Sequence, residues 1–268
     1  WIEVIMQGAD AVSLGRADLA LGVGTESMSR NPVAAYTHRD GFRMGQVEFK
    51  DFLWEALLDT SCGFSMGQTA ENLAKRHQFT REEVDAFAAR SFARALAAQS
   101  SGFLAGEIVP VVAETFECEG LKPRGIRLKG KDKDKELAAD THVRPSPIDV
   151  LAKIRPAFGG VQTGGNSSGV VDGAAAVLVA NAAYLEAKGK KPLARILGGV
   201  SIGVDPSIMG IGPVPAIKAL LQRHQLSLPE IGRIEINEAF SAQCLACARE
   251  LGLDESRLNV NGGATAIG

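Results

Sequence analysis

The chain has 268 residues, a length that suits one large α/β domain or two smaller ones. Hydrophobic residues make up 46% of it and charged residues 22%, so the chain can bury an ordinary globular core. A formal net charge of −2 gives neither a basic surface for nucleic acid nor a polybasic patch for a membrane, and we expect no partner of either kind.

The first sixty residues begin with regular elements and then lose periodicity. Residues 1–14 carry apolar side chains at helical spacing and predict an amphipathic helix. The apolar run 19–24, bounded by glycine, predicts a buried strand, and the polar residues 25–30 predict a turn at its carboxyl end. Residues 31–60 predict irregular structure with one short helix at 52–57.

Two helices are predicted next. The first covers residues 66–77, and the second begins with a complete start signal: Thr80 as N-cap and Glu83 as the partner that closes a capping box. This second helix should run to about Ala98. The alternating residues 107–116 predict a strand after it.

The remainder of the chain alternates between strand and helix patterns. A Gly/Ser/Asn-rich loop at 159–169 precedes a strand at 174–180 and a helix at 182–188. Alternation of this kind indicates sheets covered by helices, whereas residues 31–157 break the pattern and are interpreted as an insertion into the first α/β unit. Further elements are predicted at 194–203 (strand), 213–224 (helix), 231–236 (strand), 238–251 (helix) and 258–261 (strand).

Asn237-Glu238-Ala239-Phe240 stands where a predicted strand ends and a helix begins. Ligand contacts in open α/β sheets gather at this edge, so the two polar residues could bind an oxyanion or a water molecule. The alternative is structural: Asn237 as a helix N-cap, with Glu238 favourable to the helix dipole.

The four cysteines do not form a recognisable reactive site. Cys244 and Cys247 are three residues apart on an Ala/Leu-rich helix face, without a second pair or a histidine cluster, which favours buried structural thiols over a redox or metal site. Cys62 and Cys118 lie in loop-like segments without a local base. Four cysteines are too few for a disulfide framework in a chain of this length, and we predict a cytoplasmic location.

Other polar segments carry weaker signals. The loop Gly164–Gly169 offers backbone amides and hydroxyls to a ligand but lacks a nucleotide-binding pattern, and a tight turn feeding a strand is an equal alternative. The run 129–136 mixes both signs of charge, as a solvated loop does. Four scattered histidines are interpreted as surface residues: His38, His77, His142 and His224.

Seven segments of the chain form an ordered set. They are 22–29 (GVGTESMS), 66–71 (MGQTAE), 155–158 (RPAF), 165–169 with 172–175 (GNSSG and DGAA), 212–216 (GPVPA), 237–240 (NEAF) and 259–264 (NVNGGA). Together they span nearly the whole chain and resemble, in the same order, segments of the thiolases, the acyl-CoA acetyltransferases that run Claisen condensation and its reverse, thiolysis.

The resemblance implies the thiolase fold, an α/β fold of two similar halves in five layers with an inserted loop domain, here truncated at both termini. Residues 1–30 and 159–190 would then form part of the N-terminal half. Residues 31–158 would form the inserted coenzyme A-binding loop domain, and 191–268 part of the C-terminal half.

The resemblance also implies site residues. Asn237 would hold the water of an oxyanion hole that stabilises the thioester enolate, an interaction of large catalytic weight. Coenzyme A enters as the thioester substrate, with no metal or other cofactor. Ser65 stands where many biosynthetic members carry His, which affects substrate preference. Contacts to coenzyme A are implied near Leu53, Met66, Arg144, Phe158, Gly164 and Ser168.

The sequence departs from the family pattern at its ends. The acylated cysteine of the family lies in a Cys-x-Ser-Gly motif before the helix that opens this chain at Trp1. The activating histidine follows the Gly-rich segment with which this chain ends at Gly268, and a second, acid/base cysteine lies further on. Acyl transfer needs a thiolate and a base to generate it, so we expect the chain as given to be inactive.

Two functions follow as hypotheses. The first is an acyl-CoA acetyltransferase, present here as an internal fragment, which transfers acyl groups to or from coenzyme A and whose full-length form is a homodimer or homotetramer. The alternative is a non-catalytic coenzyme A-binding or oligomer-partner protein of the same fold. A ketoacyl synthase fits less well, because those enzymes use His-rich motifs where this chain has Asn237-Glu238.

Overall fold

The computed structural model describes residues 2–36, 38–117, 120, 122, 124–126, 128 and 136–268. Cys118 and residues 129–135 of the charged run lie outside the described residues, as does the side chain of His38. The chain divides into two compact units. The first comprises Trp1–His77, Val170–Gly232 and Ala246–Leu253, and the second comprises Gln78–Gly169, Arg233–Leu245 and Asp254–Gly268.

The first unit contains most of the helices predicted from the sequence, with ends shifted by one or two residues. Its longer elements are α1 (Ile2–Ser13), β1 (Leu19–Ser27), α2 (Phe52–Ala56), α3 (Met66–His77), β8 (Asp172–Ala180), α6 (Ala182–Ala187) and α7 (Pro213–His224). Short strand pairs are β2 (Val33–Ala34) with β3 (Lys50–Asp51) and β4 (Leu58–Asp59) with β5 (Phe64–Ser65). Segments of 3-10 helix are η1 (Met28–Arg30), η2 (His38–Asp40), η5 (Pro206–Ile211) and η6 (Leu228–Glu230).

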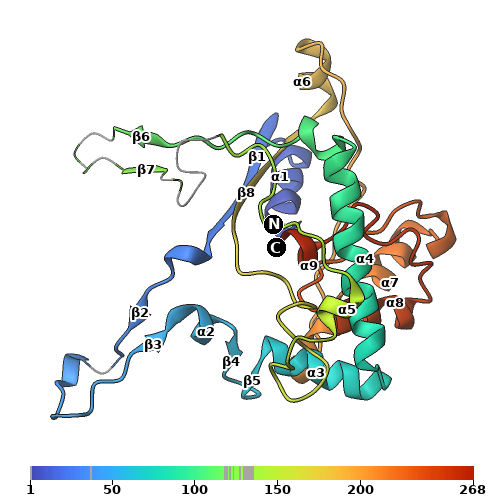
Figure 1. Cartoon of the computed structure of the whole chain (residues 1–268). Helices are drawn as coiled ribbons and strands as arrows, with labels where there is room; N and C mark the ends of the chain where they lie inside the picture. The colour runs from blue at the N-terminus through green and yellow to red at the C-terminus, as the bar shows by residue number, and fades with distance from the viewer. Residues whose placement is uncertain are drawn as a thin grey trace. The chain divides into compact units, whose positions relative to one another are not determined.

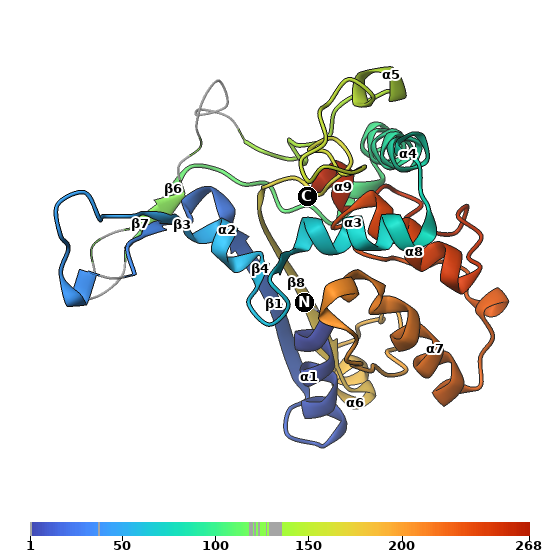
Figure 2. The same ribbon diagram turned by 90° about the horizontal axis from the view of Figure 1, so that it is seen from below.

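Strands β1 and β8 form an antiparallel ladder with α1 lying alongside (Figures 1 and 2). Its register runs from Leu19 opposite Ala180 to Ser27 opposite Asp172. The helix packs on the strand at Gly22, where a Cβ would lie in ordinary van der Waals contact, 3.5 Å from the side chain of Val4. Most side chains of both strands remain exposed in this structure.

The end of α3 and the turn η5 are tied together by polar contacts within the first unit. Asn72 of α3 donates to the carbonyl of Ser207 at 2.9 Å, and the Cys247 thiol donates to the carbonyl of Gly210 at 3.2 Å. Arg249 donates to the carbonyl of His77 at 2.9 Å. This carbonyl is the last of α3 and has no donor within the helix.

The second unit is built on α4 (Arg81–Ser100), a helix of 20 residues. The predicted capping box is confirmed: the backbone N–H of Glu83 donates to the Thr80 hydroxyl at 3.2 Å, and the backbone N–H of Thr80 donates to the Glu83 carboxylate at 2.8 Å. The unit's other elements are η3 (Phe103–Gly106), β6 (Glu114–Phe116), β7 (Arg124–Ile126), α5 (Ile148–Leu151), the start of α8 (Ser241–Leu251) and α9 (Ala264–Ile267).

One face of α4 forms the core of the second unit. Phe92 and Ala95 pack with Ala266 of α9, and Val143 and Ile267 cover this cluster. Both views in Figures 1 and 2 show α9 beside α4. The chain before α9 is therefore held against the middle of α4.

Arg94 of α4 binds the segment that precedes α9. Its guanidinium donates to the carbonyl oxygens of Leu258 at 2.6 Å and Glu255 at 3.0 Å. Arg90, one turn earlier, forms an ion pair with the Glu255 carboxylate. Two arginines thus fix the direction of residues 255–259 along α4.

Several predicted strands are wrong in extent. Residues 194–203 adopt no strand. Within the predicted strand 107–116, Glu114–Phe116 forms a strand paired with β7, and Val111 makes an isolated bridge with Leu137. A strand requires a neighbouring ladder, and within the described residues the segment 194–203 has none. Its apolar residues Ile196 and Leu197 are exposed accordingly.

The predicted strands 231–236 and 258–261 meet at a single parallel bridge, Ile234 with Leu258. The side chain of Asn259 adds two hydrogen bonds beyond this bridge, both to the backbone of Ile236. Its carbonyl accepts from the backbone N–H of Ile236 at 2.9 Å, and its amide donates to the carbonyl of Ile236 at 2.8 Å. A side chain therefore satisfies backbone groups that a longer ladder would otherwise pair.

Two element boundaries also differ from prediction. β1 continues to Ser27 and η1 follows, so the turn expected at 25–30 begins later, because the β8 partner extends to Asp172. Asp172 then accepts from the backbone N–H of Ser29 at 2.9 Å. Helix α8 begins at Ser241 rather than at residue 238, since the chain before it remains extended.

The backbone at Gly262 predicts a large effect of a single methyl group. Its φ is +83°, and a Cβ there would lie 2.6 Å from the Ala95 side chain and 2.7 Å from the Ser91 carbonyl oxygen. We expect Gly262→Ala to lower the free energy of unfolding by about 3 kcal/mol or more, measured by denaturant titration. Gly252→Ala is the matched control, because its φ is +63° with open space around it, and should cost only about 1 kcal/mol. Equal losses in the two variants would contradict close packing on α4.

Candidate functional site

The loop at residues 163–168 is shaped by its own side chains. The backbone N–H of Thr163 donates to the Asn166 side-chain oxygen at 2.7 Å, and the Thr163 hydroxyl accepts from the N–H of Gly165 at 3.1 Å. The Ser167 hydroxyl donates to the Thr163 carbonyl at 2.7 Å. Thr163 and Asn166 are both buried, so this polar turn is preformed rather than open.

This loop is joined directly to the Asn237–Phe240 segment. The N–H of Ser168 donates to the carbonyl of Ala239 at 3.0 Å, and the N–H of Ser241 donates to the carbonyl of Asn166 at 2.9 Å. Ser167 and Phe240 form an antiparallel bridge between these bonds. The structure thus brings together two segments that the sequence singled out separately, 164–169 and 237–240.

Asn237 is exposed and lies four residues before α8. The interpretation of Asn237 as a helix N-cap is therefore wrong. Asn237 lies two residues before Ala239, whose carbonyl accepts from the backbone N–H of Ser168. Its neighbour Glu238 is 1% exposed and performs a different task.

The Glu238 carboxylate accepts hydrogen bonds from α4 and from residues 259–265, and we call this arrangement the Glu238 hub. It accepts from the Ser91 hydroxyl at 2.6 Å, from the Asn259 amide at 2.8 Å and from the backbone N–H of Thr265 at 3.1 Å. The N–H of Gly263 donates to the Ser91 hydroxyl at 3.0 Å. A Cβ at Gly263 would lie 2.4 Å from the carboxyl carbon, so only glycine fits here. The carboxylate links α4 to the start of α9.

His142 lies next to Gly169, which directly follows the 163–168 loop, and Arg144 contacts His142. The Arg144 guanidinium is stacked 5.0 Å over the ring of Phe92 and donates to the His142 carbonyl at 3.1 Å. The His142 ring lies against Gly169, where a Cβ would be 2.4 Å away. Burial, and then the charge of Arg144, lower the pKa of His142. Arg144 thus carries the positive charge at this point, because a lowered pKa keeps the imidazole neutral at pH 7.

The other residues predicted to contact coenzyme A are divided between the two units. Gly164 is exposed with open space at its Cβ position, and Phe158 is half-buried, both in the second unit. In the first unit, the N–H of Leu53 donates to Asp51 at 3.0 Å, and the N–H of Met66 donates to the carbonyl of Leu57 at 2.9 Å. The first contact caps α2 and the second ties its end to α3.

Several histidine and cysteine expectations can now be compared with the structure. His77, His142 and His224 are half-buried, and His77 and His224 are the last residues of α3 and α7. Cys244 and Cys247 are fully buried, which confirms structural thiols. Among the described residues, no three His, Cys, Asp or Glu side chains are grouped as a metal site would require, and no helix has the length and apolar character needed to cross a membrane.

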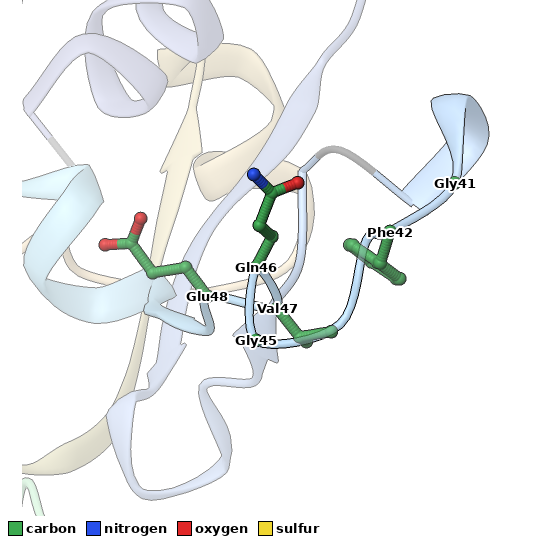
Figure 3. A pocket seen from close by; sticks show the side chains of 6 residues that line it. All are labelled: Gly41, Phe42, Gly45, Gln46, Val47 and Glu48. Atoms are coloured by element: carbon green, nitrogen blue, oxygen red, sulfur yellow. The ribbon is translucent and has the colours of Figure 1, made fainter.

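An open pocket of about 620 Å³ lies elsewhere, on the loop 41–48 (Figure 3). The six residues that line it all belong to this loop, and Glu48 also pairs with Lys50 at 2.6 Å. None of the predicted site residues lines it. The pocket is the concave side of an exposed loop rather than a cleft between packed elements.

The Glu238 hub leads to a first site prediction. Glu238→Gln retains the size of the side chain but turns one acceptor into a donor that faces Ser91, Asn259 or Thr265. We expect a loss of about 2–3 kcal/mol in unfolding free energy, because hydrogen bonds to a buried charged acceptor are strong and donors would be left unpaired. Denaturant titration measures this loss, and a variant as stable as the parent would exclude the hub role.

Replacing Glu235, three residues before Glu238, should stabilise the fold rather than destabilise it. Glu235 faces outward but is partly covered; this partial burial first, and the nearby Glu238 charge second, raise its pKa, with Arg233 and Arg94 opposing. An acid with a raised folded-state pKa costs no stability below its unfolded pKa and lowers stability as pH rises through the folded pKa. Glu235→Gln should therefore raise the melting temperature at pH 8 and leave it unchanged near pH 3. A fall in melting temperature at pH 8 would contradict this environment.

Comparison with known proteins gives consistent results along the chain. The family model described as "Thiolase, N-terminal domain" matches residues 2–183, and "Thiolase, C-terminal domain" matches residues 190–268. The chain is 41% identical to beta-ketothiolase BktB of Cupriavidus necator and 43% identical to an acetyl-CoA acetyltransferase of Pseudomonas aeruginosa. In each case the match covers 100% of this chain and 65% of the relative, so the chain spans about two-thirds of their length.

Solved structures agree with the sequence comparison. Human mitochondrial 3-ketoacyl-CoA thiolase superposes with a TM-score of 0.90 at 39% identity, over 100% of this chain and 65% of that one. A structure of the same human enzyme in complex with CoA gives 0.89 at 39% identity, over 100% of this chain and 64% of that one. The thiolase fold expected from the sequence is confirmed, and the chain belongs to the thiolase family.

Proposed function

We propose that this chain is part of a thiolase that transfers acyl groups to or from coenzyme A by Claisen condensation or thiolysis. The observation that carries the proposal is the hydrogen-bonded junction of the loop 163–168 with the Asn237–Phe240 segment, in a chain matched by both thiolase domain models. The relatives' names, acetyl-CoA acetyltransferase and 3-ketoacyl-CoA thiolase, supply the reaction class.

Coenzyme A is the proposed ligand, and a related thiolase has been solved with CoA bound. In the second unit, the contacts would be Arg144, Phe158, Gly164 and Ser168. Arg144 supplies the positive charge that suits a phosphate, and the open backbone at Gly164 admits close approach. In the first unit, the contacts would be Leu53 and Met66, which provide apolar surface. No metal or other cofactor enters the proposal.

Asn237 is the proposed oxyanion-hole residue. Its exposed side chain amide can hold a water molecule or donate to a thioester oxygen on which negative charge develops. Removing one such donor typically slows catalysis by about 10²–10³-fold. The thiolate and the base implied by the resemblance are absent from the 268 residues, because no Cys-x-Ser-Gly or Gly-His-Pro motif occurs. We therefore propose that acyl transfer belongs to the whole protein.

Other features of the whole protein stay predictions. These are a homodimer or homotetramer, the inserted loop domain at 31–158 between the parts of the N-terminal half at 1–30 and 159–190, and the C-terminal half at 191–268. Mitochondrial enzymes are among the relatives, so a cytoplasmic location also stays a prediction.

Coenzyme A binding tests the proposal. Calorimetric titration of the purified chain with coenzyme A should show one saturable site, and Arg144→Ala should weaken the affinity at least several-fold by removing the phosphate partner. Arg30→Ala, an exposed arginine outside the proposed contacts, is the control and should leave affinity unchanged. Absence of binding by the parent chain would refute the proposal.

Intact mass separates catalysis from binding alone. After incubation with acetyl-CoA, the 28.2 kDa chain should carry no acetyl adduct on cysteine, while a longer protein that contains the missing motifs should acquire one. If the longer protein binds coenzyme A and forms no adduct, the non-catalytic alternative replaces the enzyme.

A further inference from the structure

The first turns of α4 hold a buried ion pair. The Arg81 Nε donates to one oxygen of Asp85 at 2.7 Å, and Asp85 is 1% exposed. Burying a carboxylate is costly unless its charge and both of its oxygens are satisfied. The partners of this carboxylate therefore indicate what it organises.

Arg81 extends the pair to the segment after α5. Its Nη2 donates to the carbonyl of Leu151 at 2.8 Å and to the carbonyl of Ile154 at 2.9 Å. These two carbonyls belong to the end of a four-residue helix and the turn that follows it. The guanidinium thus fixes a segment about 70 residues further along the chain.

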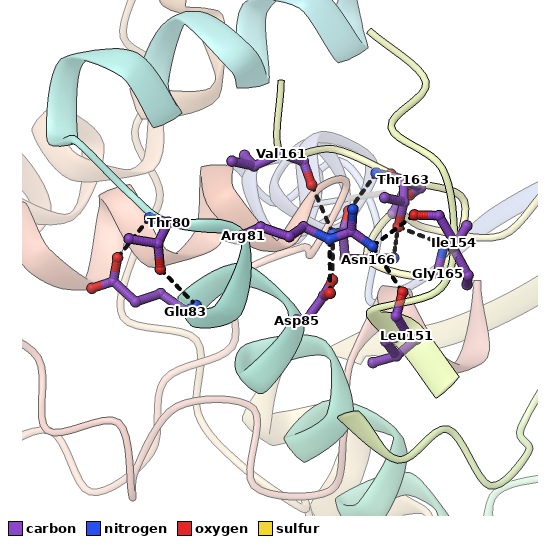
Figure 4. A network of polar contacts seen from close by, with 11 residues as sticks. Thr80, Arg81, Glu83, Asp85, Leu151, Ile154, Val161, Thr163, Gly165 and Asn166 are labelled. Atoms are coloured by element: carbon purple, nitrogen blue, oxygen red, sulfur yellow. Dashed lines mark hydrogen bonds and ion pairs between the residues drawn. The ribbon is translucent and has the colours of Figure 1, made fainter. Parts of the chain in front are cut away.

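The second oxygen of Asp85 reaches the 163–168 loop. It accepts from the Asn166 amide at 2.8 Å, and the same amide donates to the Val161 carbonyl at 2.9 Å (Figure 4). The Asn166 side-chain oxygen accepts from the backbone of Thr163, so this buried side chain is satisfied on both its polar atoms. The carboxylate therefore fixes two separate segments with its two oxygens.

The two segments also pack on each other. A Cβ at Gly165 would lie 2.5 Å from the side chain of Ile154 and 2.8 Å from that of Leu151. The loop consequently fits against the residues that Arg81 holds, with no room for a side chain between them. A shift in either segment would move the backbone at Gly164.

We propose that Asp85 is a positioning residue for ligand binding: through Arg81 and Asn166 it holds Gly164 and Ser168 in place for coenzyme A. Asp85 itself does not touch the ligand. The inference rests on the proposed function, since Gly164 and Ser168 are proposed contacts. It adds a residue that lies on a helix outside the loop and far from it in the sequence.

Asp85→Asn tests this role, because the amide retains the size but lacks the charge and one acceptor. The purified protein is titrated with coenzyme A in a calorimeter, and we expect the affinity to fall on the order of tenfold. Thr80→Ala is the matched control. It removes the N-cap of the same helix and lowers the melting temperature, yet should leave coenzyme A affinity unchanged.

A double variant, Asp85→Asn combined with Asn166→Asp, supplies the rescue. The amide introduced on α4 can accept from Arg81 and donate to the carboxylate introduced in the loop. That carboxylate still accepts from the Thr163 backbone but no longer donates to the Val161 carbonyl, so the network is restored in part. Affinity should recover toward that of the parent, although only the carboxylate and amide have exchanged places. A merely structural role predicts that affinity follows the melting temperature in all variants, Thr80→Ala included.

The outcomes separate the two proposals. If the parent chain fails to bind coenzyme A, the proposed function is wrong and the inference falls with it. If the parent binds and Asp85→Asn binds equally well, the positioning role alone is overturned. It is also overturned if Thr80→Ala weakens binding as much as Asp85→Asn at an equal loss of melting temperature.

Discussion

Two buried carboxylates, Asp85 on α4 and Glu238 in contact with it, are the constraint on which the second unit depends. A carboxylate without water must collect hydrogen-bond donors, and Asp85 and Glu238 collect theirs from segments distant in the sequence. Asp85 gathers the chain near residues 151–166, and Glu238 gathers residues 259–265. The helix provides one partner for each, Arg81 and Ser91. Polar satisfaction, as much as apolar packing, thus determines where these loops lie.

The same constraint explains why Asn237 is exposed. From Ile234 to Glu238, the side chains alternate between buried and exposed along an extended backbone. Ile234, Ile236 and Glu238 face inward, two to the apolar interior and one to its donors. Asn237 and Glu235 must then face outward. The surface position of the proposed oxyanion-hole residue is therefore a consequence of the burial of its neighbours.

The sequence predicted those features that local signals encode. The capping box of Thr80 and Glu83, the helices at 66–77 and 213–224, and the buried Cys244 depend on residues a few positions apart. The strand at 194–203 was wrong because a strand depends on a partner that no local pattern reveals. The Arg81–Asp85 pair has the visible spacing of four residues, but its partner Asn166 is 81 residues away. The partners of Glu238 could not be predicted for the same reason, since its donors come from α4 and from residues 259–265, both far from it in the sequence.

In the 163–168 loop, some residues shape the loop and others stay open to a ligand. Thr163, Asn166 and Ser167 direct their side chains into the loop itself or towards Asp85. What remains for a ligand is the open backbone at Gly164 and the half-buried Ser168. Such a loop needs no nucleotide-binding motif, because internal hydrogen bonds shape its backbone before any ligand arrives. Preformed backbone donors lose little entropy on binding. For this reason the proposed affinity for coenzyme A should depend also on buried residues that never contact the ligand.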